Sequence, residues 1–378
     1  MGNDVLILGG GVGGTIVANL VAKEVADKAR VTVVDSTGVH VYQPGFLYVA
    51  VGHQQPAALR RPESELLRHE VNLVVDQATF VDAANQKVVL RSGRTLRYDE
   101  LLLATGSRTV MDEVPGAAGA HDFYTMDGAT RLFKALQEFK GGTIVIGVAG
   151  IPYKCPPAPV EFVFLLDDYL RARHIREQSQ IKLLSPLNRA FTIETTSKLV
   201  QPILAERGIE LTGFFNVETV DPIAKTVTSL EGETIAYDLL VLVPPHRGQK
   251  VIEDSNLGDA RGWVPVDKNT LRHSNLEHVW AIGDTTNIPI SKSGSVAHYE
   301  ASVAADGIVA EVKGEKAPAH VYDGKVMCFL ETGHGQATTI RFDYDHPPVS
   351  PSPSRLWHWA KLLFNKTYWH TVPQGRLP

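Results

Sequence analysis

Cysteine is scarce in this chain, which has only Cys155 and Cys328 among 378 residues. Two cysteines cannot build the disulfide framework of a small secreted domain. If this pair has a function, we therefore expect it to come from the reactivity of the thiols. Positive charge is not in excess either, since 37 lysines and arginines stand against 42 aspartates and glutamates, a formal net charge of −5. Without an overall positive field we expect no nucleic-acid partner.

Long apolar runs are missing as well. No stretch of about 20 uncharged apolar residues is present, which excludes an ordinary membrane-spanning helix. The chain opens directly on the strand-like run Val5–Leu8, with no basic region, apolar core or cleavage site of a signal peptide. With 44% hydrophobic and 21% charged residues, the composition is that of a globular chain of two or three domains. Any contact with a membrane is therefore expected to be peripheral.

The first 36 residues carry a dinucleotide-binding pattern of buried strand, glycine loop, apolar helix and second strand. Glycines in such a loop let the backbone turn tightly and approach a pyrophosphate at a helix N-terminus. An acid at the end of the second strand accepts hydrogen bonds from an adenosine ribose. The residues that we expect to bind the cofactor here are Gly9, Gly11, Gly14, Asp35 and Ser36.

An internal repeat indicates that this unit is duplicated. Residues 93–101 and 232–240 share the pattern G-x-T-x-x-Y-D-x-L, each followed by an apolar strand. The glycine loop of the second copy is degenerate, because Ala149 and Pro152 replace its later glycines and Ser185 stands where Asp35 ended the first copy. We expect that the second copy no longer binds a nicotinamide dinucleotide.

Two further strand ends resemble the A-T-G and G-D motifs of the flavoprotein disulfide reductase superfamily. They are Ala104-Thr105-Gly106 and Gly283-Asp284. The resemblance implies an FAD cofactor, with the aspartate binding its ribityl or phosphate oxygens. The fold class that follows is α/β, with two Rossmann-like FAD/NAD(P)-binding domains in the glutathione-reductase-like arrangement and a C-terminal amphipathic segment that faces a membrane.

Cys155 lies where the degenerate second loop runs into its helix. Pro156, Pro157 and Pro159 preset the backbone dihedral φ and lack N–H donors, so a helix is expected to begin there and continue through Tyr169. A thiol near a helix N-terminus and next to Lys154 should have its thiolate favoured. A lone cysteine is often only a small buried apolar residue. A cysteine-proline turn in place of a nucleotide loop instead favours a reactive role for Cys155.

The C-terminal tail combines a stiff linker with an aromatic helix. Four prolines fall within 347–353, and residues 354–370 are predicted to be helical. Ser354, His358, Lys361 and Asn365 form a narrow polar stripe on an otherwise apolar surface. Such a basic, aromatic-rich helix suits a bilayer interface. The alternative is a helix that covers the core or makes a dimer contact.

The whole chain resembles the sulfide:quinone oxidoreductase family, most specifically in Tyr153–Glu161 (Y-K-C-P-P-A-P-V-E) and Cys328–Gly333 (C-F-L-E-T-G). The resemblance implies that Cys155 and Cys328 form a disulfide or polysulfide bridge beside FAD, with Glu161 as a proton-transfer group. It places Phe329 and, in the tail, Phe364 at the quinone. It also places Pro44 near the flavin ring, and Lys292 and Gly294 at the helix start that faces the flavin.

The function implied is oxidation of hydrosulfide to sulfane sulfur, with two electrons passing through FAD to a membrane quinone. The partners implied are hydrosulfide, a sulfur acceptor (sulfide or polysulfide), the quinone and the surface of the cell membrane, on which the protein would be peripheral. No metal is implied, and whether the chain forms a homo-oligomer stays open. We expect an FAD-binding domain of residues 1–110 and 246–315, a degenerate second domain of residues 111–245, and a C-terminal redox, quinone and membrane segment of residues 316–378.

The chain departs from the family in two respects. Residues 110–130 contain no third cysteine, so no flavin-cysteine link can form there, and the histidines thought to relay protons are not evident near residues 184–192. The remaining candidates for a relay are His121, His246, His298 and His334. Three other readings stay open: a type II NADH dehydrogenase, the flavin subunit of a sulfide dehydrogenase, and a silent flavin-binding protein on a membrane.

Overall fold

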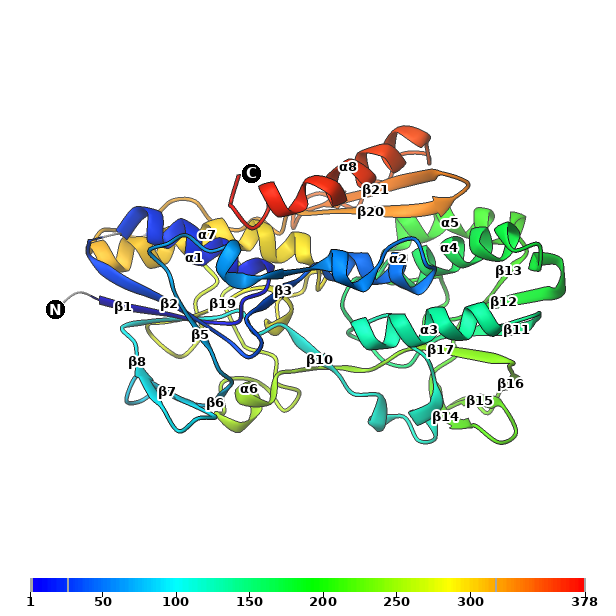
Figure 1. Ribbon diagram of the computed structural model, residues 1–378, viewed down its shortest axis with the longest axis horizontal. Helices are drawn as coiled ribbons and strands as arrows, with labels where there is room; N and C mark the ends of the chain where they lie inside the picture. The colour runs from blue at the N-terminus through cyan, green and yellow to red at the C-terminus, as the bar shows by residue number, and fades with distance from the viewer. Residues whose placement is uncertain (1–2, 26, 317, 377–378) are drawn as a thin grey trace.

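The first parallel sheet is built from both ends of the chain. The computed structural model describes residues 3–25, 27–316 and 318–376. The sheet has five strands in the order β19-β9-β1-β2-β5, all parallel. They are β1 (Asn3–Leu8), β2 (Ala29–Asp35), β5 (Asn72–Val75), β9 (Glu100–Leu103) and β19 (Val279–Ala281). Helices α1 (Val12–Val25) and α7 (Gly294–Lys313) lie side by side on one face, as Figure 1 shows, and bury the apolar strands.

The second parallel sheet is formed only by the middle of the chain. Its four strands follow the order β13-β12-β11-β17. They are β11 (Gly142–Val148), β12 (Ser179–Leu184), β13 (Ile209–Thr212) and β17 (Leu239–Val243). The helices around it are α3 (Met126–Glu138), α4 (Ala158–Ala172) and α5 (Glu194–Glu206). The predicted α/β class with two nucleotide-binding folds is confirmed.

The repeat in the sequence is a repeat in structure. Strands β6 (Ala78–Asp82), β7 (Lys87–Leu90) and β8 (Thr95–Arg97) form an antiparallel sheet, and β14 (Val217–Asp221), β15 (Thr226–Ser229) and β16 (Thr234–Ala236) form its counterpart. The pairing register shifts early in the first strand of each sheet. The two copies therefore share even a local irregularity.

Two short strands carry the chain between the halves. Strand β10 (Ser107–Thr109) pairs antiparallel with β18 (His246–Gly248), and Figure 1 shows this crossing between the two sheets. The remaining short elements are β3 (Val39–Val41), β4 (Arg60–Pro62), α2 (Phe46–Ala50) and α6 (Lys250–Asp254).

The C-terminal portion is a hairpin covered by a helix. Strand β20 (Val326–Gly333) pairs with β21 (Gln336–Phe342), and α8 (Arg355–Thr371) packs on this hairpin along one edge of both halves (Figure 1). The Ser354 hydroxyl caps α8 by accepting from the N–H of Trp357. In the described part of the chain, no helix has the length and apolar composition needed to cross a membrane.

Candidate active site

The first glycine loop is tightly packed on one side and open on the other. Gly9 has φ of 109°, and a side chain there would collide with the carbonyl oxygen of Ala104. A side chain at Gly14 would collide with the carbonyl oxygen of Gly9, whereas nothing lies within 4 Å of the Cβ position at Gly11. The loop can therefore bring its backbone against a bulky ligand only if these residues are glycine.

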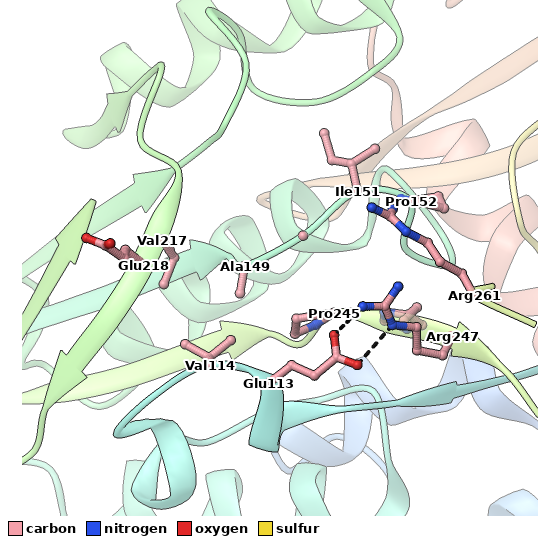
Figure 2. Close-up of a pocket in the computed structure, with 12 residues that line it drawn as sticks. Glu113, Val114, Ala149, Ile151, Pro152, Val217, Glu218, Pro245, Arg247 and Arg261 are labelled. Atoms are coloured by element: carbon pink, nitrogen blue, oxygen red, sulfur yellow. Dashed lines mark hydrogen bonds and ion pairs between the residues drawn. The ribbon is translucent and has the colours of Figure 1, made fainter. Parts of the chain in front are cut away.

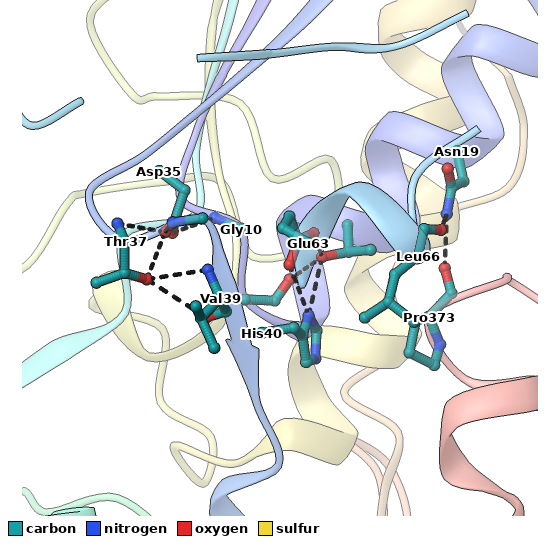
Figure 3. A network of polar contacts seen from close by, with 12 residues as sticks. Gly10, Asn19, Asp35, Thr37, Val39, His40, Glu63, Leu66 and Pro373 are labelled. Carbon is teal, nitrogen blue, oxygen red and sulfur yellow. Dashed lines mark hydrogen bonds and ion pairs between the residues drawn. The ribbon is translucent and has the colours of Figure 1, made fainter. Parts of the chain in front are cut away.

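Asp35 fixes the shape of this loop. Its Oδ2 accepts from the N–H of Gly10 at 3.0 Å, and its Oδ1 accepts from the N–H groups of Thr37 and Gly38, both at 2.8 Å (Figure 3). The carboxylate thus stands at the end of β2, beside the loop, where a ribose could reach it. Ser36 is exposed next to it.

The second part of this cradle joins the ends of β9 and β19. The hydroxyls of Thr105 and Thr285 lie 3.1 Å apart, and Gly106 and Gly283 both have positive φ. Lys292, which is buried, donates from Nζ to the carbonyl oxygens of Asp284 at 3.0 Å and Thr286 at 2.6 Å. These residues fit a flavin dinucleotide, because the loops at Gly9 and Gly283 open at the carboxyl edge of one sheet.

Two lysines balance the charge of Asp284. Burial raises the pKa of this carboxyl, and the ammonium groups of Lys154 and Lys292 oppose the rise. Burial lowers the pKa of Lys292 in turn. A cofactor in the cradle would therefore contact a buried carboxylate whose negative charge is balanced by two lysines.

The Cys155 turn docks on the start of α7. The N–H of Cys155 donates to the carbonyl oxygen of Lys292 at 2.6 Å, and Gly294 is the first residue of α7. The cysteine has φ of 54°, and α4 begins three residues later at Ala158. The turn that replaced the second glycine loop thus lies against the first nucleotide-binding unit.

Cys328, on β20, approaches the same place. Its Sγ lies 3.8 Å from the hydroxyl oxygen of Ser295, in the first turn of α7. Both cysteines are free thiols and half-buried. Their charges act on each other, since burial first and Cys328 second raise the pKa of Cys155. The structure brings the two predicted cysteines together.

The expectation that the Cys155 thiolate is favoured is wrong. Burial raises the pKa of Cys155, and it also raises the pKa of Cys328. Lys154, expected to stabilise the thiolate, donates instead to Oε1 of Gln43 at 2.8 Å. The desolvation cost of a buried thiolate outweighs the helix terminus here.

Glu161 forms a buried ion pair with the tail. It is 3% exposed, and Nζ of Lys361, 6% exposed, donates to its Oε1. Burial raises the pKa of Glu161 while Lys361 opposes the rise. Burial lowers the pKa of Lys361, but Glu161 and Glu331 outweigh it, so the pKa ends above its usual value. The ammonium therefore pairs directly with Glu161, while Glu331 acts on it only through its charge.

The polar stripe of α8 faces the protein. His358 Nδ1 lies 2.9 Å from Oε2 of Glu331, and Asn365 Oδ1 accepts from the hydroxyl of Tyr42 at 2.5 Å. The opposite face is apolar and open, with Leu356 72%, Trp359 65% and Leu363 62% exposed. The polar stripe of this helix therefore faces the core, and its exposed face is the apolar one.

The first nucleotide-binding unit also anchors the tail. His40 Nε2 lies 2.8 Å from the hydroxyl of Tyr368, and its Nδ1 lies 3.1 Å from Oε2 of Glu63. Asn19 donates to the carbonyl oxygen of Pro373 at 2.8 Å (Figure 3). The C-terminal segment is thus held on both halves.

The two predicted quinone residues meet in the structure. The ring centroids of Phe329 on β20 and Phe364 on α8 lie 6.2 Å apart. Pro44 is exposed in the turn Gln43–Gly45, close in sequence to the buried Tyr42. The sequence analysis missed Glu331, although it lies within the C-F-L-E-T-G motif, and it missed Tyr48, whose hydroxyl donates to Glu331 at 3.0 Å.

The degenerate loop borders a cavity of about 230 Å³. Ala149, Ile151 and Pro152 line it, together with Arg247 from β18 (Figure 2). Ser185 does not face a ligand as Asp35 can, because its hydroxyl donates to the carbonyl oxygen of Arg189 at 2.6 Å. Ser185, at the end of β12, therefore offers neither a carboxylate nor a free hydroxyl to a ribose.

Comparison with known proteins agrees with this arrangement. Residues 3–305 match the family model described as pyridine nucleotide-disulphide oxidoreductase. The chain belongs to this family. It is 27% identical to the mitochondrial sulfide:quinone oxidoreductase of Dictyostelium discoideum, over 98% of this chain and 86% of the relative, and 27% identical to that of Mus musculus, over 93% and 80%.

A solved structure extends the likeness to the fold. The sulfide:quinone oxidoreductase of Aquifex aeolicus superposes with a TM-score of 0.88 at 23% identity, covering 100% of this chain and 93% of that one. The resemblance read from the two cysteine motifs is thereby confirmed along the whole chain.

Proposed function

We propose that the protein is an FAD-dependent sulfide:quinone oxidoreductase, which oxidises hydrosulfide and reduces a membrane quinone. The observation that carries the proposal is the Cys155 turn, which stands in place of a nucleotide loop and docks on α7 beside Cys328. Similarity to relatives named sulfide:quinone oxidoreductase over nearly the full chain supports it. A bound FAD would supply the route by which two electrons pass from the cysteines to the quinone.

The cysteines handle the sulfur. Starting from a Cys155–Cys328 disulfide, hydrosulfide attacks one sulfur, forming a persulfide there and releasing the other cysteine as a thiolate. A second hydrosulfide takes the outer sulfur as a disulfide dianion and leaves both cysteines reduced, each carrying one of the two protons. Re-forming the disulfide releases two electrons and two protons, which the quinone takes up to become a quinol.

Cys328 is the better leaving group of the two. Burial raises its pKa, but hydrogen bonds from Ser295 and Ser293 lower it. For Cys155, burial and then the charge of Cys328 raise the pKa most. Because a sulfur of lower pKa leaves faster, we assign the attack to Cys155 and the departing thiolate to Cys328.

Glu161 and Lys361 hold a proton between the cysteines and the tail. Both groups act on the pKa values of Cys155 and Cys328, so they lie near the reacting sulfurs. Lys361 and Phe364 are three residues apart on α8 and so share one side of the helix. We place the quinone ring at Phe329 and Phe364, with Lys361 as the proton donor nearest to it.

The open face of α8 supplies the membrane contact. Leu356, Trp359 and Leu363 are exposed on this face, and Arg355 and Lys366 are exposed at its two ends. Apolar side chains with flanking cations suit the interface of an anionic bilayer. We therefore propose a peripheral location on the cell membrane, with the quinone entering from the lipid.

A type II NADH dehydrogenase is the rival that the fold allows. The replaced glycines at Ala149 and Pro152 and the engaged hydroxyl of Ser185 count against it. Anaerobic mixing of the purified holoprotein with sulfide or NADH, in separate experiments, tests the proposal through flavin absorbance. Sulfide should bleach the flavin within seconds and NADH should not, and rapid bleaching by NADH alone would overturn the proposal.

A further inference from the structure

The cavity beside the degenerate loop is lined by charged side chains and by one buried polar side chain. Its mouth carries Arg261 and the ion pair of Arg247 with Glu113, in which the guanidinium donates to both carboxylate oxygens at 2.9 and 2.7 Å (Figure 2). His246 also lines the cavity. The loop on its other side, Gly150–Pro152, leads within three residues to Cys155. The cavity thus borders the loop that leads into the reactive turn.

The tautomer of His246 is fixed by its neighbour. The side chain is 3% exposed, and its Nδ1 lies 2.8 Å from the carbonyl oxygen of Pro244, which can only accept. Nδ1 therefore carries the proton and Nε2 offers a lone pair. Burial, together with Lys154, lowers the pKa of His246 to about 3, so the ring is neutral. Within the described residues, Nε2 is buried without a hydrogen-bond partner.

Tyr124 supplies the complementary group. Its ring meets that of His246 edge-on, with centroids 5.1 Å apart, and the side chain is 4% exposed. Its hydroxyl is likewise buried without a partner in the part of the chain that the structure describes. The neighbouring Phe123 stacks on Phe162 of α4, with ring centroids 4.5 Å apart, so this segment lies beside the helix that follows the reactive turn. Two rings in contact thus each carry a buried polar atom, one donor and one acceptor, that has no partner among the described residues.

We propose that Tyr124 and His246 form a binding subsite for hydrosulfide, which the subsite holds before the sulfur reaches Cys155. Hydrosulfide has lone pairs that accept from the phenol O–H and one S–H that donates to Nε2. The positive charges of Arg261 and Lys154 favour an anion along this route. The subsite rests on the proposed function, because it serves the attack on the cysteine pair. It gives Tyr124 a first role, and it gives His246, a relay candidate from the sequence, a role in binding.

The test compares single-turnover flavin reduction over a range of sulfide concentrations. Tyr124→Phe removes the donor, and His246→Asn keeps a donor for the Pro244 carbonyl while it removes the Nε2 acceptor. Each variant should raise the sulfide concentration for half-maximal rate roughly two- to tenfold, the value of one hydrogen bond. The limiting rate and the KM for quinone should stay within about twofold, since neither residue belongs to the cysteine pair or the quinone face.

Two controls separate the subsite from a packing role. Tyr98→Phe removes another buried hydroxyl without a partner among the described residues, in the first nucleotide-binding half, and should leave the sulfide dependence unchanged. His246→Gln, whose amide oxygen can take the place of Nε2, should restore part of the lost affinity.

The results fall into three kinds: those that support the subsite, those that overturn it, and one that overturns the proposed function. A rise in the half-maximal sulfide concentration for both Tyr124→Phe and His246→Asn supports the subsite. An unchanged sulfide dependence in both variants overturns it, as does an altered flavin absorption spectrum without sulfide, which would show that these groups serve the flavin. If sulfide fails to reduce the flavin of the unaltered protein, the proposed function itself falls, a result that is distinct from the other two.

Discussion

The two nucleotide-binding copies differ most at the starts of their first helices. In the first copy, α1 begins beside Gly11, where nothing lies within 4 Å of a Cβ position. In the second copy, the first turn of α4 is filled, because Glu161 pairs there with Lys361 from the tail. The same fold therefore leaves one helix start free for a phosphate and turns the other into a support for a thiol. In the second copy a cysteine turn stands where the first copy has a glycine loop, and the C-terminal helix α8 covers it.

The largest difference between the two copies is expected at the cysteines, because only the second copy and the tail provide them. Cys155→Ser and Cys328→Ser should each lower sulfide-dependent turnover by orders of magnitude, because neither sulfur can form the bridge alone. The double variant should be scarcely worse than either single variant. Steady-state assays with a soluble quinone measure this, and FAD content should survive in all three variants. Near-normal turnover by Cys328→Ser would refute the pairing.

Substitution of Lys361 removes the ion pair that covers the start of α4. Lys361→Met leaves the buried carboxylate of Glu161 without its ammonium partner, which should cost about 3 to 5 kcal/mol of unfolding free energy. Denaturant unfolding measures the loss, and Glu161→Gln added to Lys361→Met should recover part of it.

The same variant should change the pH dependence of stability. Burial already raises the pKa of Glu161, and loss of Lys361 raises it further. The folded variant then binds protons more tightly than the unfolded chain, so its unfolding free energy should fall as pH rises through and above the ordinary carboxyl range. A stability that rises with pH over that range would contradict the assignment of Glu161 as the uncompensated group.

The outward face of the tail is tested without disturbing its inward face. Leu356→Ser, Trp359→Ser and Leu363→Ser together should weaken binding to anionic vesicles about a hundredfold, if each side chain contributes roughly 1 kcal/mol at the interface. Vesicle sedimentation measures it, and sulfide should still reduce the flavin. Phe214→Ser with Ile223→Ser, also exposed apolar residues, is the matched control. Full sedimentation of the triple variant would make α8 a packing or dimer helix.

The smallest expected effect concerns FAD binding at the glycine loop of the first copy. Gly14→Ala places a Cβ against the carbonyl oxygen of Gly9, so the loop must open and FAD affinity should fall about tenfold or more. Gly147→Ala in the second copy meets only side-chain atoms of Leu242 and Val217 and should leave FAD content unchanged. Flavin content after dialysis measures both, and equal losses would show that the two loops do not differ in role.

Much of this arrangement could be predicted from local sequence. Apolar strands, the glycine loop, the C-terminal helix and the repeated pattern at residues 93–101 and 232–240 are encoded in short segments, and the structure has them where they were expected. The pairing of Glu161 with Lys361 joins residues 200 positions apart, and no short-range pattern specifies it. The direction of the α8 stripe depends on Glu331 and Tyr42, which lie on other elements.

The thiol pKa values could not be predicted from the cysteine turn for a related reason. A helix start and a nearby lysine favour a thiolate, but their effect depends on how much water remains around the sulfur. Tertiary packing decides that, and here it removes enough water from the half-buried Cys155 and Cys328 to raise both thiol pKa values.

The central claim is that the second copy has become a sulfur-carrying site, and the most direct measurement is the mass of Cys155 after reaction. The oxidised holoprotein is mixed anaerobically with one equivalent of sulfide, quenched with an alkylating reagent and mapped by peptide mass spectrometry. We expect one additional sulfur atom on the Cys155 peptide and an alkylated free thiol at Cys328. Reduction of the flavin with no sulfur added to either cysteine would contradict the claim.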